Sequence, residues 1–228
     1  MNTQGVLVPI VTPFTKDDSV DVAALEKLIE HFIKVGVSGI VACGTTGEYY
    51  ALNETERQQV LECVVRVAKG RATVIAGING MSTQAACDRA REAEALGYDG
   101  LMLATPPYSL PGQAEVIAHF RSVAKATRLP IIMYNFPARV GVEIGIEAVA
   151  ELSKVSNIVA IKESSGDFSR ALALIKADGQ HQLLLAVHRG LRAPRSWWWP
   201  AAFAVALALT GGGVNAAVTA WVLAGPAL

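Results

Sequence analysis

The stretch IVAIKESSG, residues 158–166, places a lysine directly after four apolar residues. An apolar run of this kind is typical of a buried strand in a parallel sheet. Burial of an unpaired ammonium is costly, so a lysine at the end of such a strand needs an explanation. Two explanations are open: an acid such as Glu163 neutralises Lys162, or the amine of Lys162 takes part in a reaction.

Apolar, strand-like runs alternate with helical patterns along most of the chain. Strands are expected within residues 5–14, 37–44, 72–78, 100–107, 129–137, 157–166 and 181–187. Helices are expected at residues 22–35, from 53 onward, and at 82–97, 113–127, 146–153 and 168–177. Repeated βα units with a period of about thirty residues imply a parallel sheet, and more than five units favour its closure. We therefore predict an α/β fold, a (β/α)8 TIM barrel that is incomplete or divergent at its C-terminus, with a doubly wound open sheet as the alternative.

Capping residues support the expected positions of two helices. Asn53 stands before one helix with Glu56 in place to complete a capping box. Ser82 opens the next helix, and Gly97 closes it. These positions predict where two of the connections between helices and strands lie.

The composition argues against several classes of protein. The 228 residues include 20 basic and 20 acidic side chains, so no excess of positive charge indicates a nucleic-acid partner. Cys43, Cys63 and Cys87 are far apart and form no CxxC pair, which suits a reduced protein better than a disulfide scaffold or a zinc site. Residues 1–14 lack the pattern of a signal peptide. We therefore expect a cytoplasmic protein with no metal and no nucleic-acid or membrane partner.

Polar residues gather where the expected strands end. The second strand is followed by GTTGE, residues 44–48, and the fourth by PPY, residues 106–108. The fifth ends in Tyr134 and Asn135, and the sixth ends in Lys162. Because TIM barrels carry their catalytic groups at the carboxyl ends of the strands, this arrangement predicts a site at that end of the barrel.

Lys162 in such a position can form a Schiff base with a ketone. The reaction needs the neutral amine, so the ordinary lysine pKa of about 10.4 has to be lowered or the proton removed by a neighbour. The protonated imine then withdraws electrons, and the adjacent carbon can lose a proton and become a nucleophile. Tyr134 on the neighbouring strand is the natural proton shuttle. The alternatives are an ion pair between Lys162 and Glu163, and a core tyrosine with a satisfied hydroxyl.

Four more side chains are candidates for the same end of the barrel. Thr45 and Thr46 can relay protons to Tyr134 or bind a carboxylate, although short Gly/Thr turns are common and this one is not a Walker loop. Arg139 can bind a carboxylate through two parallel hydrogen bonds, with a solvated loop charge as the alternative. Tyr108 follows two prolines and can project toward a neighbouring subunit.

Four motifs resemble those of the dihydrodipicolinate synthase / N-acetylneuraminate lyase family. They are GTTGE, the PPY loop, YNFPARVG at residues 134–141 and IKESSGD at residues 161–167, in the order and at the spacing of that family. Four separate motifs in register make the resemblance specific. It covers about the first 180 residues, out of the seven expected barrel units at residues 1–187. It implies a (β/α)8 barrel, usually a homotetramer. It also implies a Schiff base between the lysine and pyruvate or a related 2-oxo acid, with neither a metal nor an organic cofactor.

The resemblance also implies a role for each candidate residue. Lys162 matches the Schiff-base lysine, and Tyr134 matches the proton-relay tyrosine. Thr46 matches the threonine that links this tyrosine to a second one, here Tyr108, contributed across a subunit interface. Thr45 matches the threonine that helps to hold the pyruvate carboxylate.

Arg139 matches the arginine that receives the carboxylate of the second substrate. This match favours a dihydrodipicolinate synthase-like lyase, which condenses pyruvate with aspartate semialdehyde to 4-hydroxy-tetrahydrodipicolinate in lysine biosynthesis. The stretch GEYYAL, residues 47–52, departs from the small-residue version typical of the synthases. The alternatives are a related 2-oxo acid aldolase or dehydratase and a catalytically silent barrel that binds a 2-oxo acid. An unrelated phosphate-binding barrel is a third alternative.

Residues 188–228 form a divergent apolar tail in which the resemblance stops. Beyond Asp178 the chain has no acidic residue and no lysine, and all four tryptophans lie in the tail. We expect a shifted reading frame or a truncated gene to explain this composition. One alternative is a membrane segment, but Pro200 and residues 211–213 interrupt it before the roughly twenty apolar residues that a span needs. The other is a divergent last strand and helix, without which an open barrel would expose strand edges.

Overall fold

The computed structural model describes residues 1, 3–177, 182–185, 187–190, 202–209 and 217–221, and from residue 176 onward it describes the backbone alone. Seven strands follow one another in its parallel part. They are β1 Leu7–Pro9, β2 Gly39–Ala42, β3 Thr73–Gly77, β4 Gly100–Ala104, β5 Ile131–Asn135, β6 Ile158–Glu163 and β7 Gln182–Leu185. Each strand pairs in parallel with the next.

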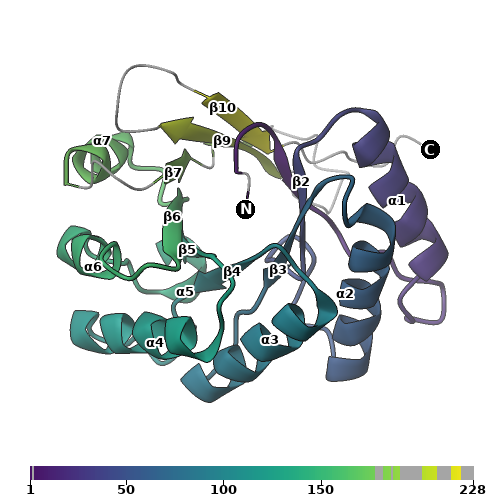
Figure 1. Ribbon diagram of the computed structural model, residues 1–228, viewed down its shortest axis with the longest axis horizontal. Coiled ribbons are helices and arrows are strands. Elements are labelled where there is room, and N and C mark those ends of the chain that lie inside the picture. Colours follow the sequence, from purple (N-terminus) through teal and green to yellow (C-terminus); the bar gives the residue numbers. More distant parts are fainter. Residues whose placement is uncertain (2, 178–181, 186, 191–201, 210–216, 222–228) are drawn as a thin grey trace.

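Helices connect these strands and lie around the outside of the sheet (Figure 1). They are α1 Val22–Lys34, α2 Glu54–Ala68, α3 Thr83–Leu96, α4 Gln113–Ala126, α5 Pro137–Val140, α6 Ile146–Leu152 and α7 Phe168–Ala177. Every predicted strand and helix has a counterpart here. The single turn α5 is additional, and most strands are shorter than the apolar runs that predicted them.

The order of the strands decides between the two predicted architectures. Strands β1 to β7 are neighbours in the order in which they occur along the chain. A doubly wound sheet reverses its order at a switch point, whereas a (β/α) barrel adds each strand on the same side. The α/β barrel prediction is therefore confirmed for the parallel part, and the open-sheet alternative is wrong.

Alternate residues of the strands supply two separate apolar layers. The layer inside the curled sheet contains Leu7, Val41, Ile75, Met102, Ala104, Ile132, Tyr134, Val140 and Ala160. Their neighbours in sequence, such as Ile40, Leu101 and Met133, belong to the larger layer between the sheet and the helices. Because side chains alternate between the faces of a strand, the position of a residue in its strand decides which layer it joins.

A register irregularity between β5 and β6 sets the phase of β6. Ile131 pairs with Ile158 but Ile132 pairs with Ala160, so Val159 is an extra residue on its strand. Val159 packs against the inner layer, to which Ala160 also belongs, and Ile161 returns to the outer layer. A bulge of this kind re-aims the side chains that follow it. The Lys162 side chain consequently faces the inside of the curled sheet, which we call the inner phase of the strand. The Glu163 side chain faces the helices, which is the outer phase.

The predicted helix caps are confirmed. The Asn53 side chain accepts from the Glu56 amide at 2.9 Å, and the Glu56 carboxylate accepts from the Asn53 amide at 2.9 Å. The Ser82 hydroxyl accepts from the Ala85 amide at 3.2 Å. Gly97 ends α3 with φ of 88°, a left-handed conformation that glycine adopts without steric cost. These caps fix the outer helices that hold β3 and β4 in place.

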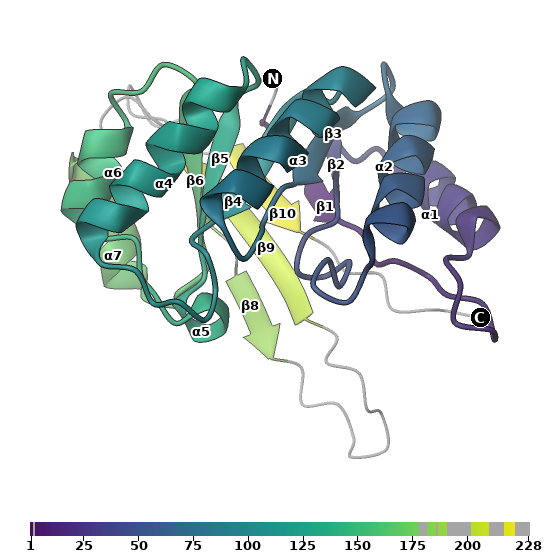
Figure 2. The same ribbon diagram turned by 90° about the horizontal axis from the view of Figure 1, so that it is seen from below.

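Beyond β7, the described residues depart from the βα pattern. Strands β8 Val187–Gly190, β9 Ala202–Leu209 and β10 Ala217–Trp221 form antiparallel pairs, β8 and β10 with β9, and β9 with β7. Figure 2 shows β8 and β10 on either side of β9, and β10 also lies against β1. The expectation of a further strand followed by a helix is thus not met in the described residues. None of the helices that the structure describes is long and apolar enough to cross a membrane.

A buried histidine joins two of the outer helices. His119 on α4 is 4% exposed, and its Nδ1 lies 2.9 Å from the Thr83 hydroxyl at the start of α3. Burial lowers the pKa of His119 to about 4, because the charged imidazolium would lose its hydration. The helix pair therefore contains a base that stays neutral at physiological pH.

We predict that acid destabilises the fold through His119. The unfolded chain binds this proton near pH 6.5 and the folded chain only near pH 4, so stability falls as the pH drops between these values. The loss between pH 7 and pH 4 should be about 3 kcal/mol. Urea denaturation at several pH values measures it. His119→Gln should flatten the pH dependence, whereas His31→Gln, at an exposed position of α1, should not. An unchanged slope in His119→Gln would contradict the prediction.

Candidate active site

Lys162 lies at the carboxyl end of β6 and points into the curled sheet. It is 4% exposed and stands opposite Tyr134 in the register of β5 and β6. Its Nζ lies 4.2 Å from the centroid of the Tyr134 ring. The two residues predicted to carry the chemistry are therefore brought together on adjacent strands, at the end of the barrel where the sequence predicted a site.

Burial makes the Lys162 amine a weak base. Loss of hydration lowers its pKa to about 7. A large fraction of the amine is therefore neutral at physiological pH. An amine in this state can attack a carbonyl carbon, whereas an ordinary surface lysine is almost fully protonated.

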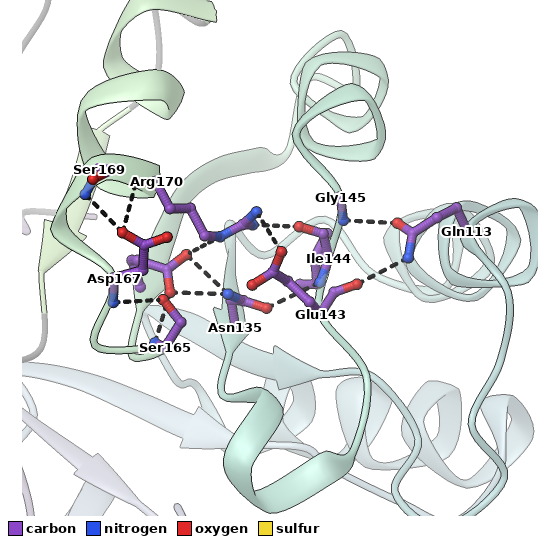
Figure 3. Close-up of polar contacts among 10 residues, drawn as sticks. Gln113, Asn135, Glu143, Ile144, Gly145, Ser165, Asp167, Ser169 and Arg170 are labelled. Carbon is purple, nitrogen blue, oxygen red and sulfur yellow. Dashed lines mark hydrogen bonds and ion pairs between the residues drawn. The ribbon is translucent and has the colours of Figure 1, made fainter.

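Glu163 is not the partner that neutralises Lys162. It lies on the opposite face of β6, and its carboxylate accepts from Asn135 Nδ2 at 2.9 Å to each oxygen. The Ser165 amide donates to the same carboxylate at 2.7 Å and Arg170 Nε donates at 2.8 Å. Figure 3 shows this group, with Arg170 and Asn135 converging from α7 and β5. Of the two explanations for Lys162, the ion pair with Glu163 is wrong.

Tyr134 is a buried phenol with hydroxyl neighbours. Burial raises its pKa above the usual value, whereas the side chains of Thr45 and Ser164 and the positive charge of Arg139 act in the opposite direction. The contact with Ser164 falls short of a full hydrogen bond, because its buried Oγ has no partner of good geometry. The phenol is therefore protonated at physiological pH and can donate a proton to a group beside Lys162.

The turn after β2 places Thr45, rather than Thr46, beside Tyr134. The sequence analysis had assigned the link with this tyrosine to Thr46 and carboxylate binding to Thr45. Both threonines are half-buried in a turn that Cys43 enters with φ of 51°. In such a turn successive side chains have no fixed alternation, so a sequence motif does not reveal which of them faces the tyrosine.

Arg139 and Tyr108 are exposed, unlike Lys162 and Tyr134. Arg139 lies on α5, and its guanidinium carbon is 6.0 Å from the centroid of the Phe136 ring. Its positive charge acts on Tyr134, so it lies on the side of the site near that phenol. Tyr108 is 90% exposed, in a loop where its φ is 71°. Within this chain the structure does not bring Tyr108 into the buried site with Tyr134.

Asn135, Glu163 and Arg170 form a buried group that the sequence analysis did not assign to the site. Asn135 is 1% exposed, Glu163 3% and Arg170 6%. One signal was present in the sequence: Arg170 interrupts an apolar helical pattern, FSRALALIKA, and a charge there requires a partner. Elsewhere, the structure places no group of three metal-binding side chains together among the residues it describes.

Comparisons with known proteins agree on one family. The sequence profile of the Dihydrodipicolinate synthetase family matches residues 2–188. A 4-hydroxy-tetrahydrodipicolinate synthase of Magnetococcus marinus is 43% identical over 183 residues, which cover 80% of this chain and 62% of the relative. The protein of the same name from Methanococcoides burtonii is 40% identical over 173 residues, covering 76% and 59%. The present chain thus spans less than two thirds of the length of these relatives.

A solved structure shows the same likeness in three dimensions. It is the chloride-inhibited dihydrodipicolinate synthase of Acinetobacter baumannii in complex with pyruvate. It is 41% identical and superposes with a TM-score of 0.79, covering 81% of this chain and 64% of its own. The likeness to this protein therefore covers both the fold and the sequence as a whole.

We predict that Lys162 reacts as an amine with a pKa of about 7. Reductive methylation with formaldehyde and cyanoborohydride, followed by peptide mass spectrometry, gives its rate as a function of pH. The rate should reach half its maximum near pH 7, whereas free Nα-acetyl-lysine in the same mixture should do so near pH 10. A midpoint for Lys162 equal to that of the free compound would contradict the assignment of a desolvated amine.

Proposed function

Because this chain belongs to the Dihydrodipicolinate synthetase family, we propose that it is a class I lyase that condenses pyruvate with aspartate semialdehyde to 4-hydroxy-tetrahydrodipicolinate. The observation that carries the proposal is the buried Lys162 amine, 4.2 Å from the ring of a protonated Tyr134. The pyruvate complex of the Acinetobacter baumannii relative supports pyruvate as the first substrate. Related 2-oxo acids and aldehydes fit the same chemistry.

The first half of the reaction joins pyruvate to Lys162. The neutral amine attacks the ketone carbon, and a proton moves from nitrogen to oxygen to give a carbinolamine. Loss of water then leaves a protonated imine. Removal of a proton from the methyl carbon of pyruvate gives an enamine, which is the carbon nucleophile. A desolvated amine starts this sequence at physiological pH without a metal or an organic cofactor.

The second half forms the carbon–carbon bond and releases the enzyme. The enamine carbon attacks the aldehyde carbon of aspartate semialdehyde, whose oxygen takes up a proton, and the imine forms again. The amino group of the second substrate then attacks the imine carbon and displaces the Lys162 amine. The ring closes in this step, so one water is lost for each pair of substrates joined.

Tyr134 and Thr45 are the proposed proton carriers. The phenol can donate to the departing carbinolamine oxygen, take up a proton again from the enamine-forming carbon, and then donate that proton to the aldehyde oxygen. Thr45, beside the phenol, is the next hydroxyl for the proton. We propose carboxylate binding for Thr46, the neighbouring hydroxyl of the same turn. We propose that Tyr108 completes the relay from a second copy of the chain, since its side chain projects into solvent here.

Arg139 is the proposed receptor for the second substrate. It is exposed, lies over the Phe136 ring and carries its charge near Tyr134. A guanidinium binds a carboxylate through two parallel hydrogen bonds, so it can hold the α-carboxylate of aspartate semialdehyde while the aldehyde faces Lys162.

The proposal has three further features. They are a homo-oligomeric state (dimer or tetramer), a cytoplasmic location and a place in lysine biosynthesis. The extent of the family match, residues 2–188, supports a barrel unit of residues 1–187 and a separate tail of residues 188–228.

Trapping the imine tests the central step. Incubation of the full-length chain with pyruvate and borohydride should attach one reduced pyruvate to the peptide that contains Lys162. Lys162→Ala should not be labelled. Propionate, which lacks the ketone that forms the imine, should not label either protein. Absence of an adduct in the wild type would contradict the proposal. An adduct without turnover of any aldehyde would indicate the silent, 2-oxo acid-binding alternative.

Two substitutions separate the proposed roles of Arg139 and Tyr134. Arg139→Ala should leave the pyruvate adduct intact but raise the KM for aspartate semialdehyde, because only the second carboxylate loses its partner. Tyr134→Phe should lower kcat by roughly 10²- to 10⁴-fold, the range typical of a lost acid–base group. Steady-state kinetics with each substrate varied in turn gives both values. If Arg139→Ala lowered the yield of the pyruvate adduct as well as raising the KM for aspartate semialdehyde, the result would contradict a role confined to the second substrate.

A further inference from the structure

We infer that Arg170 is a positioning residue: with Asn135 it holds the Glu163 carboxylate on the outer face of the sheet, away from the Lys162 amine. The inference depends on the proposed function for its meaning, because it concerns the reactive lysine, but its test does not require any substrate. Lys162 and Glu163 are consecutive in the sequence, and Glu163 is the one acidic residue in strands β5, β6 and β7. The carboxylate that could most easily stabilise the protonated lysine is therefore that of its own neighbour.

The Glu163 carboxylate is held at both oxygens. Asn135 stands opposite it in the register of β5 and β6, and its Nδ2 donates to Oε1 and to Oε2 at 2.9 Å each. The Ser165 amide donates to Oε1 at 2.7 Å, and Arg170 Nε donates to Oε2 at 2.8 Å. Arg170 is the one cation among these donors, so it alone compensates the charge of the buried carboxylate.

Arg170 is itself fixed from three directions. Its Nε binds Glu163 on β6, and one terminal nitrogen donates to Glu143 Oε1 at 3.1 Å. The other terminal nitrogen donates to the carbonyl of Ile144, whose amide donates to Asn135 Oδ1 at 3.0 Å. Figure 3 shows these contacts tying α7 to the segment between α5 and α6. A side chain with this many fixed contacts at 6% exposure has a defined position from which to hold Glu163.

Gln113 extends the same support to the far side of that segment. Its Nε2 donates to the Glu143 carbonyl at 2.9 Å, and its Oε1 accepts from the Gly145 amide at 2.7 Å. The segment between α5 and α6 is therefore held by α4, by β5 and by α7. It cannot easily move away and release Arg170.

On the inner face, the structure places Tyr134 from β5 beside Lys162, and Tyr49 after β2 and Arg139 on α5 both act on Tyr134. The sequence of β7 contributes only Gln182 and three leucines. An opposite charge within about 4–6 Å favours the charged form of a lysine, so a Glu163 carboxylate that moved toward Lys162 would raise the pKa of its amine.

The pH dependence of Lys162 methylation tests this inference in the full-length chain. Arg170→Gln removes the cation that compensates Glu163, and we expect the midpoint for Lys162 to rise from about 7 by at least one pH unit. The methylation rate at pH 7 should then fall by at least about fivefold, because the neutral fraction drops from one half to about one eleventh. Arg170→Lys keeps a cation and should keep a midpoint close to that of the wild type. The double variant Glu163→Gln with Arg170→Gln, which has no carboxylate to misplace, should return the midpoint to the wild-type value.

A merely structural role for Arg170 would give a different pattern. In that case Arg170→Gln would lower the melting temperature without moving the midpoint, or the double variant would be shifted as far as the single one, and either result overturns the inference. If Arg170→Gln does not fold, Asn135→Ala loosens the same carboxylate and should raise the midpoint in the same direction; an unchanged midpoint there counts against the inference. Formaldehyde methylation needs no pyruvate, so a wild type without a pyruvate adduct would defeat the proposed function and leave this test valid.

Discussion

The register between β5 and β6 is the constraint on which the site depends. Val159 is an extra residue in β6, and it gives Lys162 the inner phase and Glu163 the outer phase. A shift by one residue would exchange the two faces, because side chains alternate along a strand. The amine would then lie between the sheet and the helices, and the carboxylate would lie beside Tyr134. A local irregularity in one strand pair thus decides which of two adjacent charged residues is available for chemistry.

The sequence predicted the repeated βα units and the end of the barrel that carries the site, because both depend on periodicity along one strand or helix. The capping residues Asn53 and Ser82 are local in the same sense. The sequence left open an ion pair between Lys162 and Glu163, because the face on which each side chain lies depends on a bulge that no hydrophobic pattern reveals. The sequence also could not show that Thr45, rather than Thr46, lies beside Tyr134, since the turn after β2 has no regular alternation.

The buried group around Glu163 could not be predicted from the sequence, for a different reason. Asn135, Ile144 and Arg170 are separated along the chain and meet only when β5, β6 and α7 pack together. A lone arginine in an apolar helix indicates that a partner exists but does not identify it. The C-terminal part shows the same limit: a run such as AFAVALAL favours a strand, yet its antiparallel pairing with β7 and β8 depends on contacts distant in sequence.

The neutral state of Lys162 has a consequence for the native fold as a whole. An unfolded chain holds this lysine in water with a pKa near 10.4, whereas the folded chain holds it at about 7. Folding near neutrality therefore expels a proton, and this expulsion opposes the native state by about 4 kcal/mol at pH 7. The desolvation that makes the amine nucleophilic is thus a source of thermodynamic instability, and the rest of the barrel has to be stable enough to tolerate it.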